Sequence, residues 1–171
     1  MKKVKSEKGI GLVLFILIFV GILLISAIVV GVVIINKNLN KEPITISEFK
    51  EMMEDKDFEI VDAKEQFEDY DYVKKVYIAL EEDYDYQIEF YKLDDEENAE
   101  YFYNINKKIF ENSKTSPSKE TNVSMGNNSK YTLTTADEYK VVSRIENTVI
   151  YADVDEKYED EVKEILKDMG Y

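Results

Sequence analysis

The longest pattern in the chain is an uncharged run from Ile10 to Ile35, in which 21 of the 26 residues are Ile, Leu, Val or Phe. As a helix rising about 1.5 Å per residue, this run would reach roughly 39 Å, more than a hydrocarbon core of about 30 Å. A cleavable signal peptide has a shorter apolar region of about 7 to 15 residues and ends at a small-residue site. The run therefore predicts a retained transmembrane helix over residues 10–35.

Lysine residues flank this run unequally. Four of them lie in the basic leader, residues 1–9, whereas only Lys37 and Lys41 follow the run closely. Because cytoplasmic flanks carry the excess of Lys and Arg, the asymmetry predicts a cytoplasmic N-terminus and a C-terminal domain outside the cytoplasm. We expect a single-pass protein of the cell membrane that contacts the lipid bilayer through residues 10–35.

Past a polar linker over residues 36–46, periodic patterns predict the elements of an exposed domain over residues 47–171. Thr45 and Glu48 have the spacing of a capping box, which favours a helix over 47–56. The predicted strands are 58–61, 72–80, 84–90, 131–135, 139–145 and 149–154, the last two joined by a tight turn at Glu146–Asn147. The strand over 84–90 alternates Tyr84, Tyr86, Ile88 and Phe90 with polar residues.

Two more helices complete the predicted domain. An acidic start at Asp94 introduces a helix that ends near Asn112, and the C-terminal segment carries one apolar stripe. The expected buried stripes are Tyr101, Phe102, Ile105 and Ile109 in the first helix, and Tyr158, Val162, Ile165, Leu166 and Met169 in the second. Residues 112–130 are rich in Asn, Ser, Thr and Lys, and we expect them to form a mobile loop.

The order of these elements predicts an α+β fold, with an antiparallel sheet of about six strands and about three helices on one face. A shift of 61 residues aligns Ile88 with Val149 and Phe90 with Tyr151, followed in both copies by an acidic helix start. The match indicates either a duplicated unit or two instances of a common motif.

Composition narrows the chemistry that the domain can perform. Residues 36–171 hold 18 basic and 35 acidic residues, a net charge of −17 that repels nucleic acid. The chain has no Cys and no His, so thiol catalysis, His-based triads and Cys or His metal sites are excluded. Beyond the apolar run only Gly126 and Gly170 remain, too few for a glycine-rich phosphate cradle. We predict no cofactor.

Carboxylates are the only abundant reactive groups. Two clusters, Asp83 with Asp85 and Asp153 with Asp155, are candidates for a weak calcium site, although Asp83–Gln87 lacks the glycine turn and distal Glu of an EF-hand loop. A solvated acidic face explains the same clusters. Ser116 and Lys119 have the S-x-x-K spacing of Ser-Lys hydrolases, but they lie in a polar segment with a proline. Paired carboxylates of the glycosidase type remain an alternative, yet no residue is singled out as catalytic.

Tyrosine is unusually frequent, with 13 residues against no Trp. Because a Tyr ring can be buried while its hydroxyl stays wet, these side chains suit either a recognition surface or a sheet core. The candidates for the surface are Tyr70, Tyr72, Tyr77, Tyr84, Tyr86 and Tyr91.

The stretch Lys8-Gly9-Ile10-Gly11-Leu12-Val13, after a basic leader and before a long apolar segment, resembles the N-terminus of type IV prepilins and related clostridial membrane proteins. The resemblance covers about the first 30 residues and implies cleavage after Gly9. It departs from the family at Leu14, where prepilins usually carry Glu, and at the linker, where pilins continue the helix.

These observations favour a non-enzymatic, extracytoplasmic binding module with a protein or cell-envelope partner. A pilin-like subunit of a surface filament or secretion apparatus is the alternative function.

Overall fold

The computed structural model describes residues 39–171, and residues 40–171 form one compact unit. The predicted basic leader and the predicted transmembrane helix lie outside the described residues. Within residues 39–171, no helix combines the length and the apolar character needed to cross a bilayer. Residues 40–45 form no helix or strand and lead directly into the first helix of the unit.

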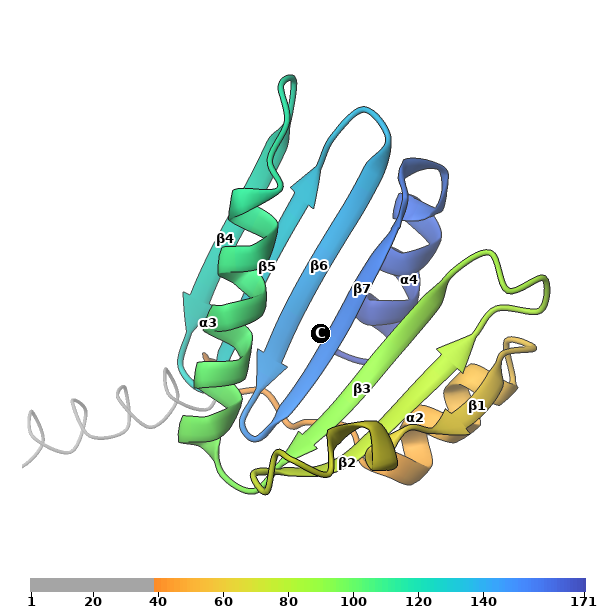
Figure 1. The fold of residues 1–171 in the computed structure, drawn as a ribbon, viewed down its shortest axis with the longest axis vertical. Helices are drawn as coiled ribbons and strands as arrows, with labels where there is room; N and C mark the ends of the chain where they lie inside the picture. Colours follow the sequence, from red (N-terminus) through yellow and green to blue (C-terminus); the bar gives the residue numbers. More distant parts are fainter. Residues whose placement is uncertain (1–38) are drawn as a thin grey trace, which may run out of the picture. The chain divides into compact units, whose positions relative to one another are not determined.

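A single antiparallel sheet of seven strands organises the unit, with three α-helices packed against it (Figure 1). The order of strands across the sheet is β1-β2-β3-β7-β6-β5-β4, so β3 and β7 meet at the centre. The strands are β1 (Glu59–Asp62), β2 (Val73–Leu80), β3 (Gln87–Leu93), β4 (Lys119–Met125), β5 (Asn128–Thr134), β6 (Glu138–Ile145) and β7 (Thr148–Asp155). The helices are α2 (Ile46–Glu54), α3 (Glu96–Asn112) and α4 (Glu159–Asp168), with short 3-10 helices η1 (Lys64–Phe67) and η2 (Glu156–Tyr158).

Local signals explain where the helices begin. The predicted capping box is present, because Thr45 Oγ1 accepts from the Glu48 amide while Glu48 Oε2 accepts from the Thr45 amide. Asp95 caps α3 through a bond from the Asn98 amide to its carboxylate, 2.8 Å long. The turn between β6 and β7 is also where it was predicted, with Ile145 paired to Thr148 and Glu146 in a left-handed conformation.

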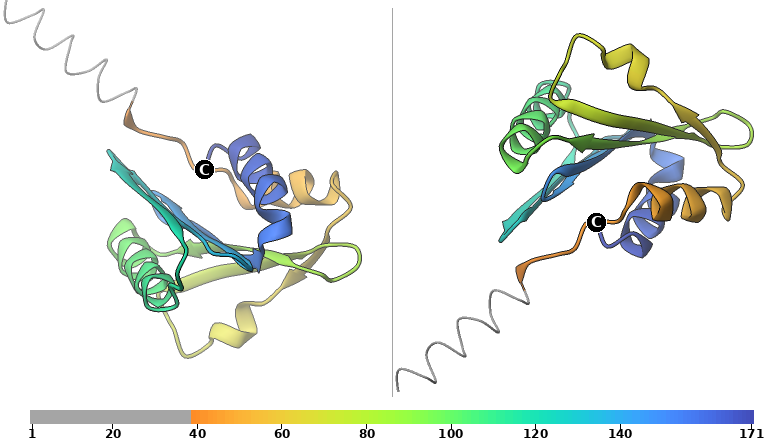
Figure 2. Two further views of the ribbon diagram at one scale, coloured as in Figure 1. Left: turned by 90° about the horizontal axis from the view of Figure 1, so that it is seen from above. Right: turned by 90° about the horizontal axis from the view of Figure 1, so that it is seen from below.

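The predicted α+β fold with an antiparallel sheet is confirmed, but the prediction of helices on one face is wrong. Helices α2 and α4 cover one face and α3 covers the other, as Figure 2 shows. The physical reason is that the central strands are buried on both faces: in β6, Val141 packs under α4 whereas Val142 packs with the α3 side. A sheet with two apolar faces needs a cover on each.

The prediction for residues 112–130 also needs correction, because β4 occupies 119–125 and β5 already begins at Asn128. All seven residues of β4 are exposed, and the strand is held by its backbone ladder with β5. An edge strand that buries no side chain carries no apolar alternation. The sequence of β4 therefore shows no strand period, and this strand was not predicted. The sheet has seven strands rather than about six.

The two segments related by the 61-residue shift do not occupy equivalent positions. Ile88 and Phe90 pack under α2 and α4, whereas their counterparts Val149 and Tyr151 pack on the α3 side. Since β3 and β7 are antiparallel neighbours, a two-fold rotation that exchanged them would keep each counterpart on the same face. The structure thus favours two instances of a common motif over a duplication.

Candidate ligand-binding groove

Helix α3 presents a different face to the sheet from the one predicted. Its buried residues are Ala99, Tyr103 and Phe110, a stripe at helical spacing. Three residues of the predicted stripe point away from the sheet, since Tyr101 is 57%, Ile105 40% and Ile109 54% exposed, whereas Phe102 is partly buried against the core. Both stripes satisfy the helical period, and the long aromatic side chains of Tyr103 and Phe110 reach the core. The sequence prediction is therefore wrong for Tyr101, Ile105 and Ile109, and these three side chains form an apolar strip that faces solvent.

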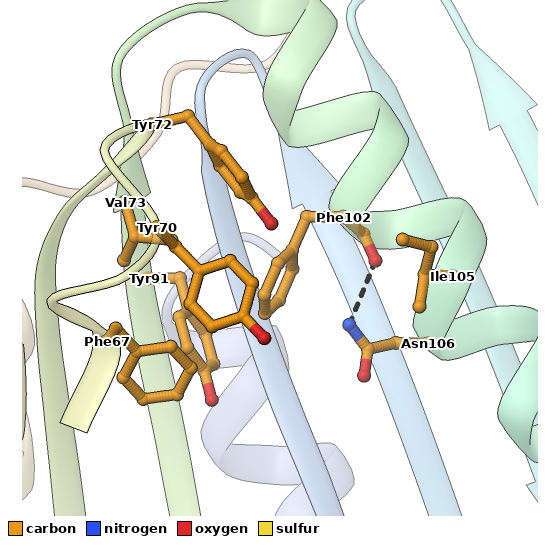
Figure 3. A pocket seen from close by; sticks show the side chains of 8 residues that line it. All are labelled: Phe67, Tyr70, Tyr72, Val73, Tyr91, Phe102, Ile105 and Asn106. Atoms are coloured by element: carbon orange, nitrogen blue, oxygen red, sulfur yellow. Dashed lines mark hydrogen bonds between the residues drawn. The ribbon is translucent and has the colours of Figure 1, made fainter.

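Ile105 of this strip lines a hollow of about 270 Å³ between α3 and the segment that connects η1 to β2. Figure 3 shows the lining side chains, which come from η1, the η1–β2 connection, β2, β3 and α3. We call this hollow the aromatic groove. It is lined by Phe67, Tyr70, Tyr72, Val73, Tyr91, Phe102, Ile105 and Asn106.

The five aromatic rings of the groove contact one another in an unbroken series. Ring centroids are 5.8 Å apart for Tyr70 and Tyr72, and 6.3 Å apart for Phe67 and Tyr70. From Phe67 the series continues to Tyr91 at 5.5 Å and then to Phe102 at 4.5 Å. The interplanar angles run from 45° to 83°, so the rings are inclined rather than stacked flat. Inclined rings present both faces and edges to the space between them.

Backbone hydrogen bonds fix the segment that carries Phe67 and Tyr70. The Tyr70 amide donates to the Phe67 carbonyl, and the Val73 amide donates to the Tyr70 carbonyl, each within 3.1 Å. Lys64 Nζ donates to the Phe67 carbonyl at 3.0 Å, a bond that joins the two ends of η1. These bonds hold the exposed Tyr70 and the half-buried Phe67 in place.

The opposite wall of the groove is equally well supported. Tyr91, on β3, donates its hydroxyl to Glu89 and is itself buried. Burial, together with the negative charge of Glu89, raises the pKa of this hydroxyl, so Tyr91 stays neutral. Asn106 donates through Nδ2 to the Phe102 carbonyl one turn earlier, at 2.9 Å. Tyr72 has a raised pKa because of partial burial and the proximity of Tyr101 and Tyr70.

The chain segment that brings Phe67, Tyr70 and Tyr72 to the groove also carries four carboxylates. They belong to Glu65, Glu68, Asp69 and Asp71, all of them exposed, and we call this group the acidic rim. Lys64 is the single base between residues 64 and 72. An aromatic lining and an exposed, negatively charged neighbouring segment therefore occur together on this wall of the groove.

The six candidate tyrosines divide between surface and core. Tyr77 and Tyr86 are buried in the core under α2 and α4, and Tyr91 is buried at the base of the groove. Tyr70 is 49% exposed and Tyr84, at a turn with φ of 60°, is 65% exposed. The strand predicted from Tyr84 onward begins at Gln87 instead. Three of the tyrosines predicted for a recognition surface, Tyr70, Tyr72 and Tyr91, line the groove. Phe67 also lines it but was not predicted, because its segment shows no regular period.

The candidate cation clusters come together only in part. Asp85 and Asp153 line a second hollow of about 400 Å³ at the tip of β2 and β3. Asp85 accepts from the Tyr158 hydroxyl and pairs with Lys157, and Asp153 binds Lys140 Nζ at 2.7 Å. The other two members, Asp83 and Asp155, are exposed outside this hollow. Within residues 39–171, no group of three or more potential metal ligands is gathered.

The S-x-x-K pair does not form a buried site. Ser116 and Lys119 are both exposed, and a cis peptide bond joins Ser116 to Pro117 between them. Lys119 opens the edge strand β4. This arrangement lacks the enclosed helix start that Ser-Lys chemistry requires.

Comparison of the chain with protein-family models, with curated proteins and with solved structures found no match.

Proposed function

We propose that this protein is a membrane-anchored, extracytoplasmic binding module that is not an enzyme and that holds a partner in the aromatic groove. The observation that carries the proposal is the series of five contacting rings, from exposed Tyr70 to buried Tyr91, that lines a hollow beside the exposed Ile105 of α3. Burying apolar surface stabilises a folded chain by about 25 cal/mol per Å². A monomer has no need to leave a contiguous set of aromatic and aliphatic side chains in water, and such patches mark binding surfaces.

The lining groups support binding over catalysis. The polar groups in the groove are tyrosine hydroxyls and the amide of Asn106. The Tyr91 hydroxyl and the Asn106 amide are already engaged by neighbours, and the pKa values of Tyr72 and Tyr91 are raised, away from nucleophile activation. Aromatic rings with few polar groups are suited to hold a ligand by contact area and shape.

The position of the module outside the cytoplasm rests on the uncharged run and on the lysines before it. Protease added to intact protoplasts should cut residues 40–171, and it should leave the basic leader protected until the cells are lysed. Protection of the C-terminal domain in intact protoplasts would reverse the proposed orientation.

Site-directed photocrosslinking in native cells tests the binding function. A photoreactive phenylalanine analogue at position 105 lies at the groove, and the same analogue at position 121 lies on the exposed edge strand as a control. We expect one discrete adduct at position 105, absent at position 121 and lost when Tyr70→Ala is added. Equal labelling at both positions, or an adduct indifferent to Tyr70→Ala, would contradict the proposal.

A further inference from the structure

The charges around the aromatic groove are strongly unequal, and the acidic ones are unpaired. Among residues 39–171, none of the four carboxylates of the acidic rim forms an ion pair. The nearby bases, in contrast, have local partners: Lys64 Nζ binds the Phe67 carbonyl, Lys74 pairs with Asp94, and Lys107 pairs with Glu111. Lys108, exposed on α3, shows no such contact among the described residues.

The aromatic rings of the groove and the acidic rim both favour a positively charged ligand group. A cation that lies over the face of an aromatic ring is attracted by the ring quadrupole, and the attraction grows as the site excludes water. The unit already contains such a contact, with Lys50 Nζ 3.9 Å from the centroid of the Tyr77 ring. In the groove, the inclined rings of Tyr70, Phe67 and Phe102 offer several faces, and no lysine of the unit lies over any of them.

Resting on the proposed function, we propose that the partner of the aromatic groove is a basic, extended segment of another protein. One Lys or Arg side chain of that segment enters the five-ring groove, its aliphatic stem against Ile105 and its charge over the rings. A second positive charge of the segment faces the acidic rim. Long basic side chains suit both environments, because their stems are apolar and their heads are charged.

A membrane surface or a second copy of this chain could also bury the apolar lining of the groove. Charge favours a basic segment over both. An anionic membrane surface would bring lipid charges against the acidic rim, and a second copy would bring another domain with a net charge of −17. Like charges placed opposite each other oppose docking. A basic segment instead gains from the same field, and its association should weaken as salt screens the interaction over about 8 to 10 Å.

The test uses the full chain in nonionic maltoside micelles and three synthetic peptides. The probe is acetyl-Leu-Lys-Leu-Lys-Leu-amide, and in the two control peptides norleucine or glutamate replaces both lysines. Methyl-labelled isoleucine provides the readout: Ile105 reports the groove, and buried Ile165, under the opposite face, reports the rest of the fold. An Ile105→Val variant assigns the signal.

We expect the lysine peptide to shift Ile105 but not Ile165, with an affinity about tenfold higher than that of the norleucine peptide. Asp69→Asn/Asp71→Asn should lower the affinity severalfold, whereas Glu51→Gln/Glu54→Gln, the same charge change on exposed α2, should leave it unchanged. Tyr70→Ala should lower it about tenfold through loss of a ring face. Lys108→Gln should raise it.

The alternative results are separable. Equal binding of the lysine and norleucine peptides would overturn the basic partner while leaving the groove a binding site. Failure of all three peptides to shift Ile105 would overturn both this inference and the proposed function. A shift caused by anionic lipid vesicles, or by raising the protein concentration alone, with no response to the lysine peptide, would replace the basic segment by a membrane or by a second copy.

Discussion

Phe110 of α3 stacks on Tyr151 of β7, with ring centroids 5.1 Å apart and ring planes 29° from parallel. Lys140 Nζ lies 5.7 Å from the centroid of the same Phe110 ring. This stacking fixes how α3 is rotated about its axis, because a helix that turns Phe110 inward must turn the adjacent Ile109 outward. The aromatic groove depends on that rotation, since it leaves Phe102 and Ile105 beside the open rings.

Two neighbouring truncations test the rotation of α3. Phe110→Ala should lower the free energy of unfolding by about 3 to 4 kcal/mol, because it opens a cavity at a position that is 1% exposed. Ile109→Ala should change it by less than about 0.5 kcal/mol, because Ile109 is exposed. Urea unfolding followed by tyrosine fluorescence measures both. A cost for Ile109→Ala equal to that of Phe110→Ala would restore the predicted helix face.

The sequence predicted the positions of strands and helices better than it predicted which of their faces are buried. Strands β6 and β7 and helix α4 were predicted within a few residues, since their apolar periods are strong and their ends carry turn signals. In α3 two apolar stripes have the same period, and only the shape of the sheet decides which one is buried. Strand β4 and the cover on both faces were missed for a related reason, because pairing at a sheet edge and two-sided burial depend on tertiary context.

The sequence indicated which residue types form the candidate groove, but not that they come together. An excess of tyrosine indicated a surface or a core, and the structure uses tyrosines for both. Phe67 and Phe102 lie 35 residues apart in the sequence and both contact Tyr91, a proximity that no local pattern encodes. The acidic rim was visible as charge, but its place beside aromatic rings follows from the fold.

Asp153 should stabilise the protein through Lys140. The Lys140 side chain is 7% exposed, and its Nζ contacts Asp153 at 2.7 Å and Glu138 at 3.2 Å. Burial alone would lower the pKa of Lys140, but the bonds and charges of both carboxylates outweigh it and raise the pKa. Asp153→Ala should therefore cost about 1 to 2 kcal/mol, below the value for a fully buried pair because Asp153 is 35% exposed.

An exposed pair provides the control for Asp153. Asp168→Ala removes the pair with Lys56, whose side chains are 36% and 45% exposed, and should cost less than about 0.5 kcal/mol. Adding Lys140→Met to Asp153→Ala should recover stability. The buried ammonium group, which would otherwise keep only Glu138 as a partner, is then removed. If the two aspartate variants unfold at the same urea concentration, Lys140 does not depend on Asp153.

Asn127 should hold the start of the domain in place. Its side chain accepts from the Lys41 amide at 2.9 Å and donates to the Lys41 carbonyl at 2.8 Å. Asn127→Ala removes both bonds, so amide exchange across residues 40–45 should accelerate while exchange in the sheet stays unchanged. Asn104→Ala, on the exposed side of α3, is the matched control. Unchanged exchange at residues 40–45 would mean that other contacts, such as Lys41 Nζ with the Gly170 carbonyl, suffice.

Buried tyrosines should set the alkaline limit of stability. Burial raises the pKa of Tyr103 and of Tyr131 to about 12, with Glu120 adding to the effect at Tyr131, and it also raises the pKa of Tyr139 and Tyr151. In the unfolded chain these hydroxyls ionise near pH 10. The stabilisation that they provide is thus complete below about pH 10, and it is lost as the pH rises toward the folded values.

The free energy of unfolding should accordingly stay level from about pH 8 to pH 9.5 and fall above about pH 10, by up to about 1.4 kcal/mol per pH unit for each such tyrosine. Phenolate absorbance, followed with near-ultraviolet circular dichroism, provides the measurement. The absorbance of the buried tyrosines should appear only as the dichroism of the folded state disappears. Tyr103→Phe/Tyr131→Phe should make the fall shallower, because two of the groups that release a proton on unfolding are gone. Ionisation of all thirteen tyrosines near pH 10 in a chain that keeps its folded dichroism would show that burial does not control their titration.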